Sequence, residues 1–274
     1  MRNFCTVVLG LCAVATSPSF AQGQPFDTSP EWEIRAGGGA LFVPSFLGSK
    51  DYQLLALPNI EIAYGDVFEA SVQRGVRYSV LQASDFAVGP VAKLDFGREE
   101  DGSRTFRVAG NTSDALLGLV DIGTTIELGG FAKYSQGPFT AFVELRQGVN
   151  GHKGLLGEAG VNYARRSSML GVGTIFSIGP SVKFSNARYA QTFFGINAAQ
   201  SLGSGLGVFA AEGGIHSYGI GSTAIFLLNE RLSATLLGRY DRLVGDAKAS
   251  PLVQERGSAN QALVGVFLTY SLFK

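Results

Sequence analysis

Apolar and polar residues alternate along most of the chain, with the period of two that is typical of β-strands. Near the C-terminal end, for example, Val264, Val266 and Leu268 alternate with Gly265 and Thr269. Helical repeats of apolar residues are scarce, and no uncharged apolar run is long enough for a helix that spans a membrane. The pattern therefore predicts an all-β fold, with strands at 31–43, 54–64, 66–81 (a hairpin turning at Arg74-Gly75), 85–97, 124–135, 138–150, 155–165, 169–183, 190–200, 206–215, 219–228, 231–243 and 261–273.

The first 21 residues do not share this pattern. A short positive start and the apolar run 4–15 are followed by the small-residue exit 19–21. This order is typical of a cleaved secretory signal peptide. We therefore expect residues 1–21 to be removed and residues 22–274 to form a single β-barrel domain.

Alternation alone is compatible with a secreted β-sandwich or with a membrane barrel, which turns its apolar face to lipid and its polar face to the lumen. The strands run for about ten residues, which suits a tilted bilayer crossing. Aromatic residues lie near strand ends, as in the interfacial girdles of such barrels. Charges such as Glu144, Arg146 and Arg239 stand in mid-strand. These features favour a transmembrane antiparallel β-barrel of about 12 strands (about 10–14), with those three residues as candidate lumen charges.

Composition excludes several classes of function. The formal net charge is zero, so the basic excess of a nucleic-acid-binding protein is absent. Cys5 and Cys12 both lie within the expected signal peptide, so the mature chain would have no disulfide, thiolate metal site or cysteine nucleophile. The 37 glycines suit tight turns and the bending of a sheet that closes on itself.

The sequence contains no recognisable catalytic or ligand-binding pattern. We expect His152 to be a solvated loop residue, and His216 and Ser217 to point to opposite faces of a strand. The run Gly203–Gly207 is expected to be a hairpin turn, and Glu99–Asp101 a solvated loop tip. The sequence therefore predicts no catalytic residue, no cofactor and no metal site.

Short motifs recur in a fixed order from the first strand to the last. They comprise the segment 44–52, with Pro44, Gly48, Ser49 and Tyr52; the pair Gly65 and Asp66; Gly179-Pro180, Tyr189 and Phe193–Gly195; and the segment 240–253, with Gly245, Asp246, Ser250 and Pro251. Taken together, they resemble the MipA/OmpV family of Gram-negative outer-membrane proteins, whose first name means MltA-interacting protein.

The resemblance implies an outer-membrane β-barrel that contacts outer-membrane lipid. It also implies a non-enzymatic envelope scaffold, whose partners would be a murein lytic transglycosylase and a murein synthase. The motif positions would then be structural or would dock a partner, and the loops 44–53, 98–114 and 244–260 are candidates for docking. A passive channel with a charged lumen, or a surface or adhesive protein, remains an alternative.

Overall fold

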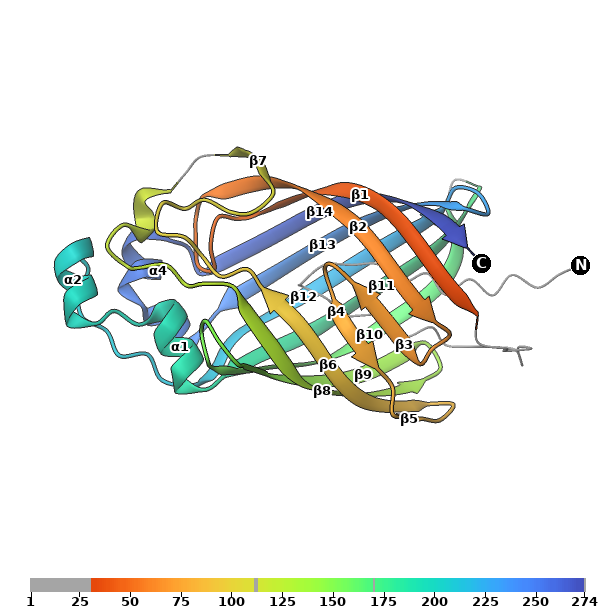
Figure 1. Ribbon diagram of the computed structural model, residues 1–274, viewed down its shortest axis with the longest axis horizontal. Helices are drawn as coiled ribbons and strands as arrows, with labels where there is room; N and C mark the ends of the chain where they lie inside the picture. Colours follow the sequence, from red (N-terminus) through yellow and green to blue (C-terminus); the bar gives the residue numbers. More distant parts are fainter. Residues whose placement is uncertain (1–30, 111–112, 170, 274) are drawn as a thin grey trace, which may run out of the picture.

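The computed structural model describes residues 31–110, 113–169 and 171–273 of the chain, and these form one closed barrel (Figure 1). Each barrel strand pairs with its neighbours in antiparallel fashion, and the sheet closes because β1 pairs with both β2 and β14. This confirms the predicted all-β barrel of about 12 strands, because twelve of the fourteen strands of the sheet form its wall. In order around the wall, the strands are β1 (Trp32–Pro44), β2 (Tyr52–Tyr64), β3 (Phe68–Ser71), β4 (Gly75–Tyr78), β6 (Phe86–Asp95), β8 (Thr125–Gln136), β9 (Phe139–Gly148), β10 (Leu155–Met169), β11 (Val172–Ser185), β12 (Gly214–Leu227), β13 (Leu232–Leu243) and β14 (Asn260–Phe273).

Two further strands extend this wall. β5 (Leu81–Gln82) pairs with β6, and β7 (Arg107–Gly110) pairs with the first residues of β2. The hairpin formed by β3 and β4 turns at Val72–Arg74, close to the predicted Arg74-Gly75. It is shorter than every other hairpin of the barrel wall.

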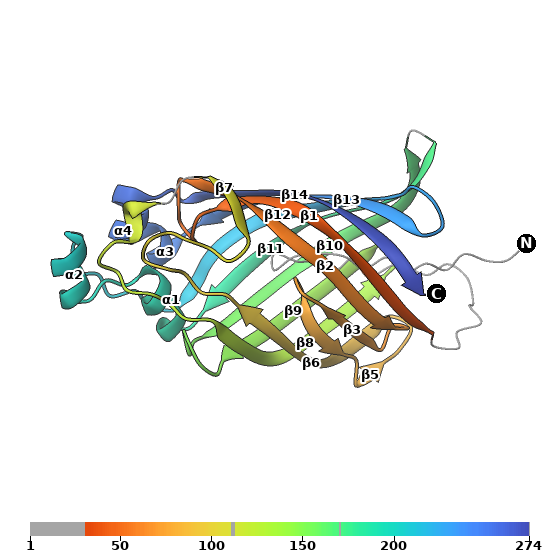
Figure 2. The same cartoon turned by 45° about the horizontal axis from the view of Figure 1, so that its top comes forward.

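The two ends of the barrel differ (Figure 2). All helices of the described residues gather at one end, which we call the long-loop end; the start of β1 and the end of β14 lie at the other, the short-turn end. The long-loop end holds the helices η1 (Asp114–Leu116), α1 (Ala187–Phe194), α2 (Ala198–Ser204), α3 (Gly245–Ala249) and α4 (Pro251–Arg256). The short-turn end holds tight connections such as Gly65–Val67, Gly137-Pro138 and Leu228–Arg231.

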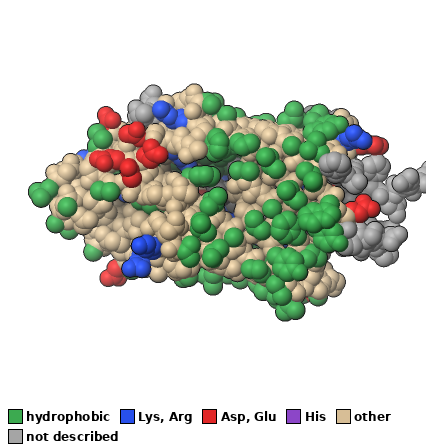
Figure 3. Space-filling model, viewed as in Figure 1, with side chains coloured by type: hydrophobic (Ala, Val, Ile, Leu, Met, Phe, Trp, Pro, Cys, Tyr) green, Lys and Arg blue, Asp and Glu red, His purple; other side chains and the backbone are tan. Residues whose placement is uncertain are grey.

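Apolar side chains cover the outside of the wall (Figure 3). Val264, Val266 and Leu268 are each about half exposed, whereas Thr269 of the same strand is buried in the interior. Rings pack at both rims: Trp32 lies 4.9 Å from Tyr64 at the short-turn end, and Phe42 stacks on Tyr52 at 4.9 Å near the long-loop end. Across the described residues, helices are too short and too polar to cross a bilayer.

The strands predicted at 190–200 and 206–215 were wrong. Residues 187–204 contain α1 and α2, because Asn186 and Asn197 cap their first turns by accepting from the backbone N–H of Tyr189 and Gln200. Residues 206–213 form an irregular connection with one isolated bridge, between Phe209 and Ile196, and β12 begins at Gly214. Gly205, expected in a hairpin turn, ends α2 in the left-handed conformation. The predicted signal peptide lies outside the described residues.

The long loops pack into an apolar cap over the long-loop end. Its centre is α1, where Phe194 is fully buried against residues from three other connections. A neighbouring cluster joins the β1–β2 loop to α4 through Phe46 and Leu252. The cap therefore covers the mouth of the barrel with a small hydrophobic core of its own.

Candidate functional site

Glu144 on β9 is the centre of one group of charges inside the barrel. Its carboxylate accepts from Lys93 Nζ at 2.8 Å and also pairs with Arg77 and Arg146. Arg146 Nε in turn donates to Glu127 at 2.7 Å. The Arg77 guanidinium lies 5.7 Å from the ring centre of Phe131. Two of the three candidate lumen charges, Glu144 and Arg146, thus lie inside the barrel in one network.

Arg239 on β13 is the centre of a second group. It lies 3.0 Å from Glu158 and 2.7 Å from Asp241, and its Nη2 donates to Ser181 Oγ at 2.8 Å. Lys183 Nζ reaches Asp241 at 3.2 Å. Each of these charged side chains thus has an oppositely charged partner, as buried ions require.

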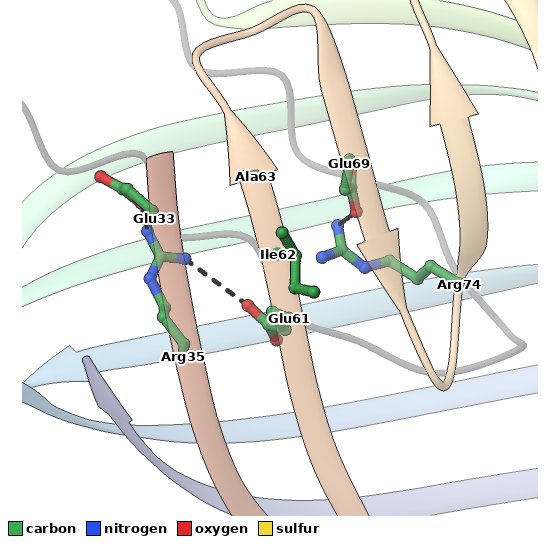
Figure 4. A pocket seen from close by; sticks show the side chains of 7 residues that line it. All are labelled: Glu33, Arg35, Glu61, Ile62, Ala63, Glu69 and Arg74. Atoms are coloured by element: carbon green, nitrogen blue, oxygen red, sulfur yellow. Dashed lines mark hydrogen bonds and ion pairs between the residues drawn. The ribbon is translucent and has the colours of Figure 1, made fainter. Parts of the chain in front are cut away.

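A third group lies toward the short-turn end (Figure 4). Arg35 on β1 pairs with Glu33 and, at 3.5 Å, with Glu61 on β2, while Arg74 from the β3–β4 turn pairs with Glu69. The space between these side chains is too small to hold a water molecule. Sequence reasoning did not single out these five residues, although the inward phase of the alternation in β1 and β2 contains three of them.

His152 is not a solvated loop residue, as the sequence suggested, but is almost fully buried. Its Nδ1 accepts from the Gly154 N–H, and its Nε2 lies 3.0 Å from Glu127 Oε1. Its ring packs edge-on against Tyr189 of α1 at 5.1 Å. The residue therefore ties the β9–β10 loop to both the cap and the lumen charges.

His216 and Ser217 do not face opposite sides of β12, because an irregularity of register at this point leaves both side chains buried. His216 stacks on Tyr189 at 5.7 Å, under the cap. No group of metal-ligating side chains was found in the part of the chain that the structure describes.

The family-motif residues of the first loop support the cap. The Pro44 carbonyl accepts from Arg104 Nη1 at 2.9 Å, and burial lowers the pKa of that guanidinium. The Gly48 N–H donates to Gln261 Oε1 at 3.1 Å, and the buried Ser49 hydroxyl accepts from the Asp51 N–H at 3.0 Å. Tyr52 Oη accepts from the Ala262 N–H at 3.1 Å.

The motif residues of the last loop lie beside them. Ser250 is completely buried and donates to the Phe194 carbonyl at 2.6 Å, which fixes the end of α1. Asp246 accepts from the Glu212 N–H at 2.7 Å. Pro251 occupies the first turn of α4, and Gly245 begins α3 with a positive φ of 55°. Of the ten residues named from the first, second and last motifs, these eight therefore meet at the long-loop end.

The two residues of the second motif lie at the opposite end. Gly65 and Asp66 form the turn between β2 and β3, and the Asp66 carbonyl accepts from Ser79 Oγ at 3.3 Å. The Asp66 side chain is exposed. The structure thus separates these two positions from the other eight by the length of the barrel.

An even-stranded antiparallel barrel with an apolar belt, aromatic rims and charged interior defines an outer-membrane β-barrel protein. Within that class the chain belongs to the MipA family, described as "MltA-interacting protein MipA", which matches residues 36–272. The chain is 27% identical over 161 residues to the outer membrane protein OmpV of Vibrio cholerae, covering 58% of this chain and 59% of OmpV. The match thus spans less than two thirds of that relative.

Among solved structures, the chain is similar to the NanC porin, with 10% identity and a TM-score of 0.43 over 87% of this chain and 100% of the other. It is also similar to a bacterial polysaccharide outer membrane secretin, with 8% identity and a TM-score of 0.43 over 90% and 100%.

Membership of this class also orients the barrel. Bacterial outer-membrane barrels have short periplasmic turns and longer outer loops. The cap formed by the long loops therefore faces the outside of the cell. The short-turn end, with Gly65 and Asp66, faces the periplasm.

Proposed function

We propose that this chain is a non-catalytic scaffold, which docks a murein lytic transglycosylase, and with it a murein synthase, at the short-turn end of the barrel. The description of its family as MltA-interacting supports a partner of this kind. The orientation of the barrel supports the place, because the short turns are the part that a periplasmic enzyme can reach.

One observation favours a scaffold over a passive channel. The charges that would line an open lumen are paired with one another, as Glu144 is with Lys93 and Arg239 is with Glu158. The cap, with Phe194 at its centre, packs over the outer mouth. The ion pairs inside the barrel and the cap over its outer mouth both favour a closed barrel over an open passage, whereas the periplasmic surface stays available for docking.

The three loops that the sequence suggested for docking, 44–53, 98–114 and 244–260, belong to the long-loop end. We therefore assign docking to the short turns, and a structural role to the eight motif residues of the cap. Asp66 and Glu230 are exposed carboxylates on two of these turns. They give the docking surface acidic points that a complementary basic patch on the partner would recognise.

Charge reversal at the two ends tests the assignment. Asp66→Arg and Glu230→Arg, each in the full chain in detergent, are expected to weaken binding of a purified murein lytic transglycosylase by about threefold to tenfold each. Glu212→Arg is the matched control, since Glu212 is equally exposed but lies at the long-loop end. Binding would be measured by interferometry with the transglycosylase immobilised.

The proposal fails if the unaltered chain does not bind the transglycosylase. It also fails if Glu212→Arg weakens binding as much as the two short-turn variants do. Each variant is first shown to be folded by its heat-modifiable migration in gels.

A further inference from the structure

The barrel wall has one weak seam, between β4 and β6. These two strands pair only at Val76 with Ala92 and at Arg77 with Val91. By contrast, β1 and β2 pair continuously from Trp32 opposite Tyr64 to Pro44 opposite Tyr52. Hydrogen bonds between strands hold a barrel closed, so this seam is the place where the wall opens most easily.

A proline contributes to the weakness of the seam. In β6, the Val88 carbonyl points toward the β4 side, where it accepts from the Val80 N–H at 3.0 Å. Pro90, two residues further on, faces the same side but has no N–H to donate. The ladder is therefore interrupted directly below the two remaining pairs.

Above those pairs, side chains and not backbone close the wall. The segment before β7 is held to β2, because the Ala56 N–H donates to the Phe106 carbonyl at 2.9 Å. Toward β6 this segment makes a contact between rings, in which Phe106 meets Phe96 edge-on at 6.3 Å. The outward side chains beside the seam, Val76, Leu94, Phe96 and Phe106, are all exposed and apolar. The outer surface on both sides of the seam is thus apolar and suited to contact with lipid acyl chains.

Inside the barrel, one carboxylate holds the two sides of the seam together. Arg77 lies on β4 and Lys93 on β6, and both pair with Glu144 of β9. Arg146 forms ion pairs with both Glu144 and Glu127. The cluster therefore places two cations, Arg77 and Lys93, directly behind the seam.

We propose that the seam is a lateral entry, through which an anionic phospholipid of the surrounding membrane places its phosphate beside Arg77 and Lys93. The phosphate takes the position of the Glu144 carboxylate, which keeps Arg146 as its partner. The acyl chains lie against the apolar outer surface on both sides of the seam. The charge of the head group determines which lipid binds. The phosphate of an anionic lipid accepts charge-assisted hydrogen bonds from arginine and lysine. A lipid without net charge already carries a cation in its head group, so its phosphate is less able to bind these side chains. The site does not depend on docking at the short-turn end.

A disulfide across the seam tests the entry. Val76→Cys with Ala92→Cys places two cysteines at paired, outward-facing positions of β4 and β6. Leu236→Cys with Val266→Cys is the matched control, at paired outward positions of the continuous β13–β14 ladder. The native Cys5 and Cys12 lie within the predicted signal peptide and do not interfere in the mature chain.

Binding of phosphatidylglycerol to the full chain in neutral detergent would be followed by native mass spectrometry. The oxidised seam variant is expected to bind at least about tenfold more weakly than the same variant after reduction. The control pair should bind equally in both states. Phosphatidylcholine and inorganic phosphate should bind weakly to every form.

Two substitutions check the head-group site independently. Glu144→Gln removes the competing carboxylate and is expected to raise phosphatidylglycerol affinity several-fold, whereas Lys93→Met is expected to lower it. The proposal is overturned if the oxidised seam variant binds as well as the reduced one, or if phosphatidylcholine binds as tightly as phosphatidylglycerol. Should Glu144→Gln fail to fold, the disulfide comparison alone decides the question.

Discussion

Glu144 on β9 and Glu158 on β10 lie directly opposite each other inside the barrel. Like charges in this position repel each other, and the interior offers little water to screen them. The structure compensates each carboxylate separately: Glu144 pairs with Lys93 and its other cations, while Glu158 pairs with Arg239 at 3.0 Å and accepts from Ser181 at 2.9 Å. The two charge networks therefore meet at this pair and form one continuous layer across the lumen.

Arg239→Met is expected to destabilise the barrel strongly. It removes the cation that pairs directly with Glu158, and it removes one of the two cations that contact Asp241. Breaking a buried ion pair from one side typically costs about 3–5 kcal/mol, because a charge is left uncompensated. The measurement is the temperature at which the folded band converts to the unfolded band in gel electrophoresis.

Two controls accompany this variant. Arg231→Met removes an exposed arginine from the β12–β13 turn and should leave the conversion temperature nearly unchanged. The double variant Glu158→Gln with Arg239→Met should recover much of the loss, since it removes the stranded carboxylate as well. A conversion temperature for Arg239→Met equal to that of Arg231→Met would contradict the role of this pair.

The purified protein is expected to show no conductance steps in planar bilayers. The lumen charges are paired with each other, and the space between the side chains around Arg35 and Arg74 is too small to hold a water molecule. A general porin inserted under the same conditions serves as the positive control. Reproducible steps that scale with salt concentration would instead favour the passive channel.

Much of the fold follows from the sequence, because a period of two assigns each strand residue to one face. The alternation of Lys93 and Leu94 between lumen and lipid was predictable for this reason, as was the interior position of Glu144. The ion-pair partners of these residues were not predictable, since they depend on the register between strands. Nothing local in the sequence places Glu144 opposite Glu158, or makes the β3–β4 hairpin too short to fill the wall beside β6.

The cap was less predictable than the barrel. Apolar residues in 190–200 and 206–215 suggested strands, yet Asn197 and Gln200 form a reciprocal capping box that starts α2. That spacing was a usable helix signal. The burial of His152 had no such signal, because it depends on the packing of α1, far along the chain, against the β9–β10 loop.

His152→Ala is expected to loosen the cap without opening the barrel. The substitution removes the contact with Glu127 and the ring packing against Tyr189, so the β9–β10 loop loses its attachment to α1. Deleting a buried aromatic group with a hydrogen bond to a charged partner costs about 2–4 kcal/mol. Limited proteolysis of intact cells should cut the outer loops faster than in the unaltered protein. Unchanged cleavage would show that His152 does not hold the cap.

Ser250, a family-motif residue, joins α4 to α1. Its hydroxyl is the buried donor to the Phe194 carbonyl at 2.6 Å. Ser250→Ala leaves that carbonyl without the donor, which typically costs about 1–3 kcal/mol. The cap should then unfold at a lower urea concentration, as followed by hydrogen exchange of the amides in α1 and α4, while the barrel amides stay protected. Ser258→Ala is the control, because Ser258 is less buried and its Oγ contacts only Asn260 nearby. Equal exchange in the two variants would show that the Ser250 hydrogen bond does not stabilise the cap.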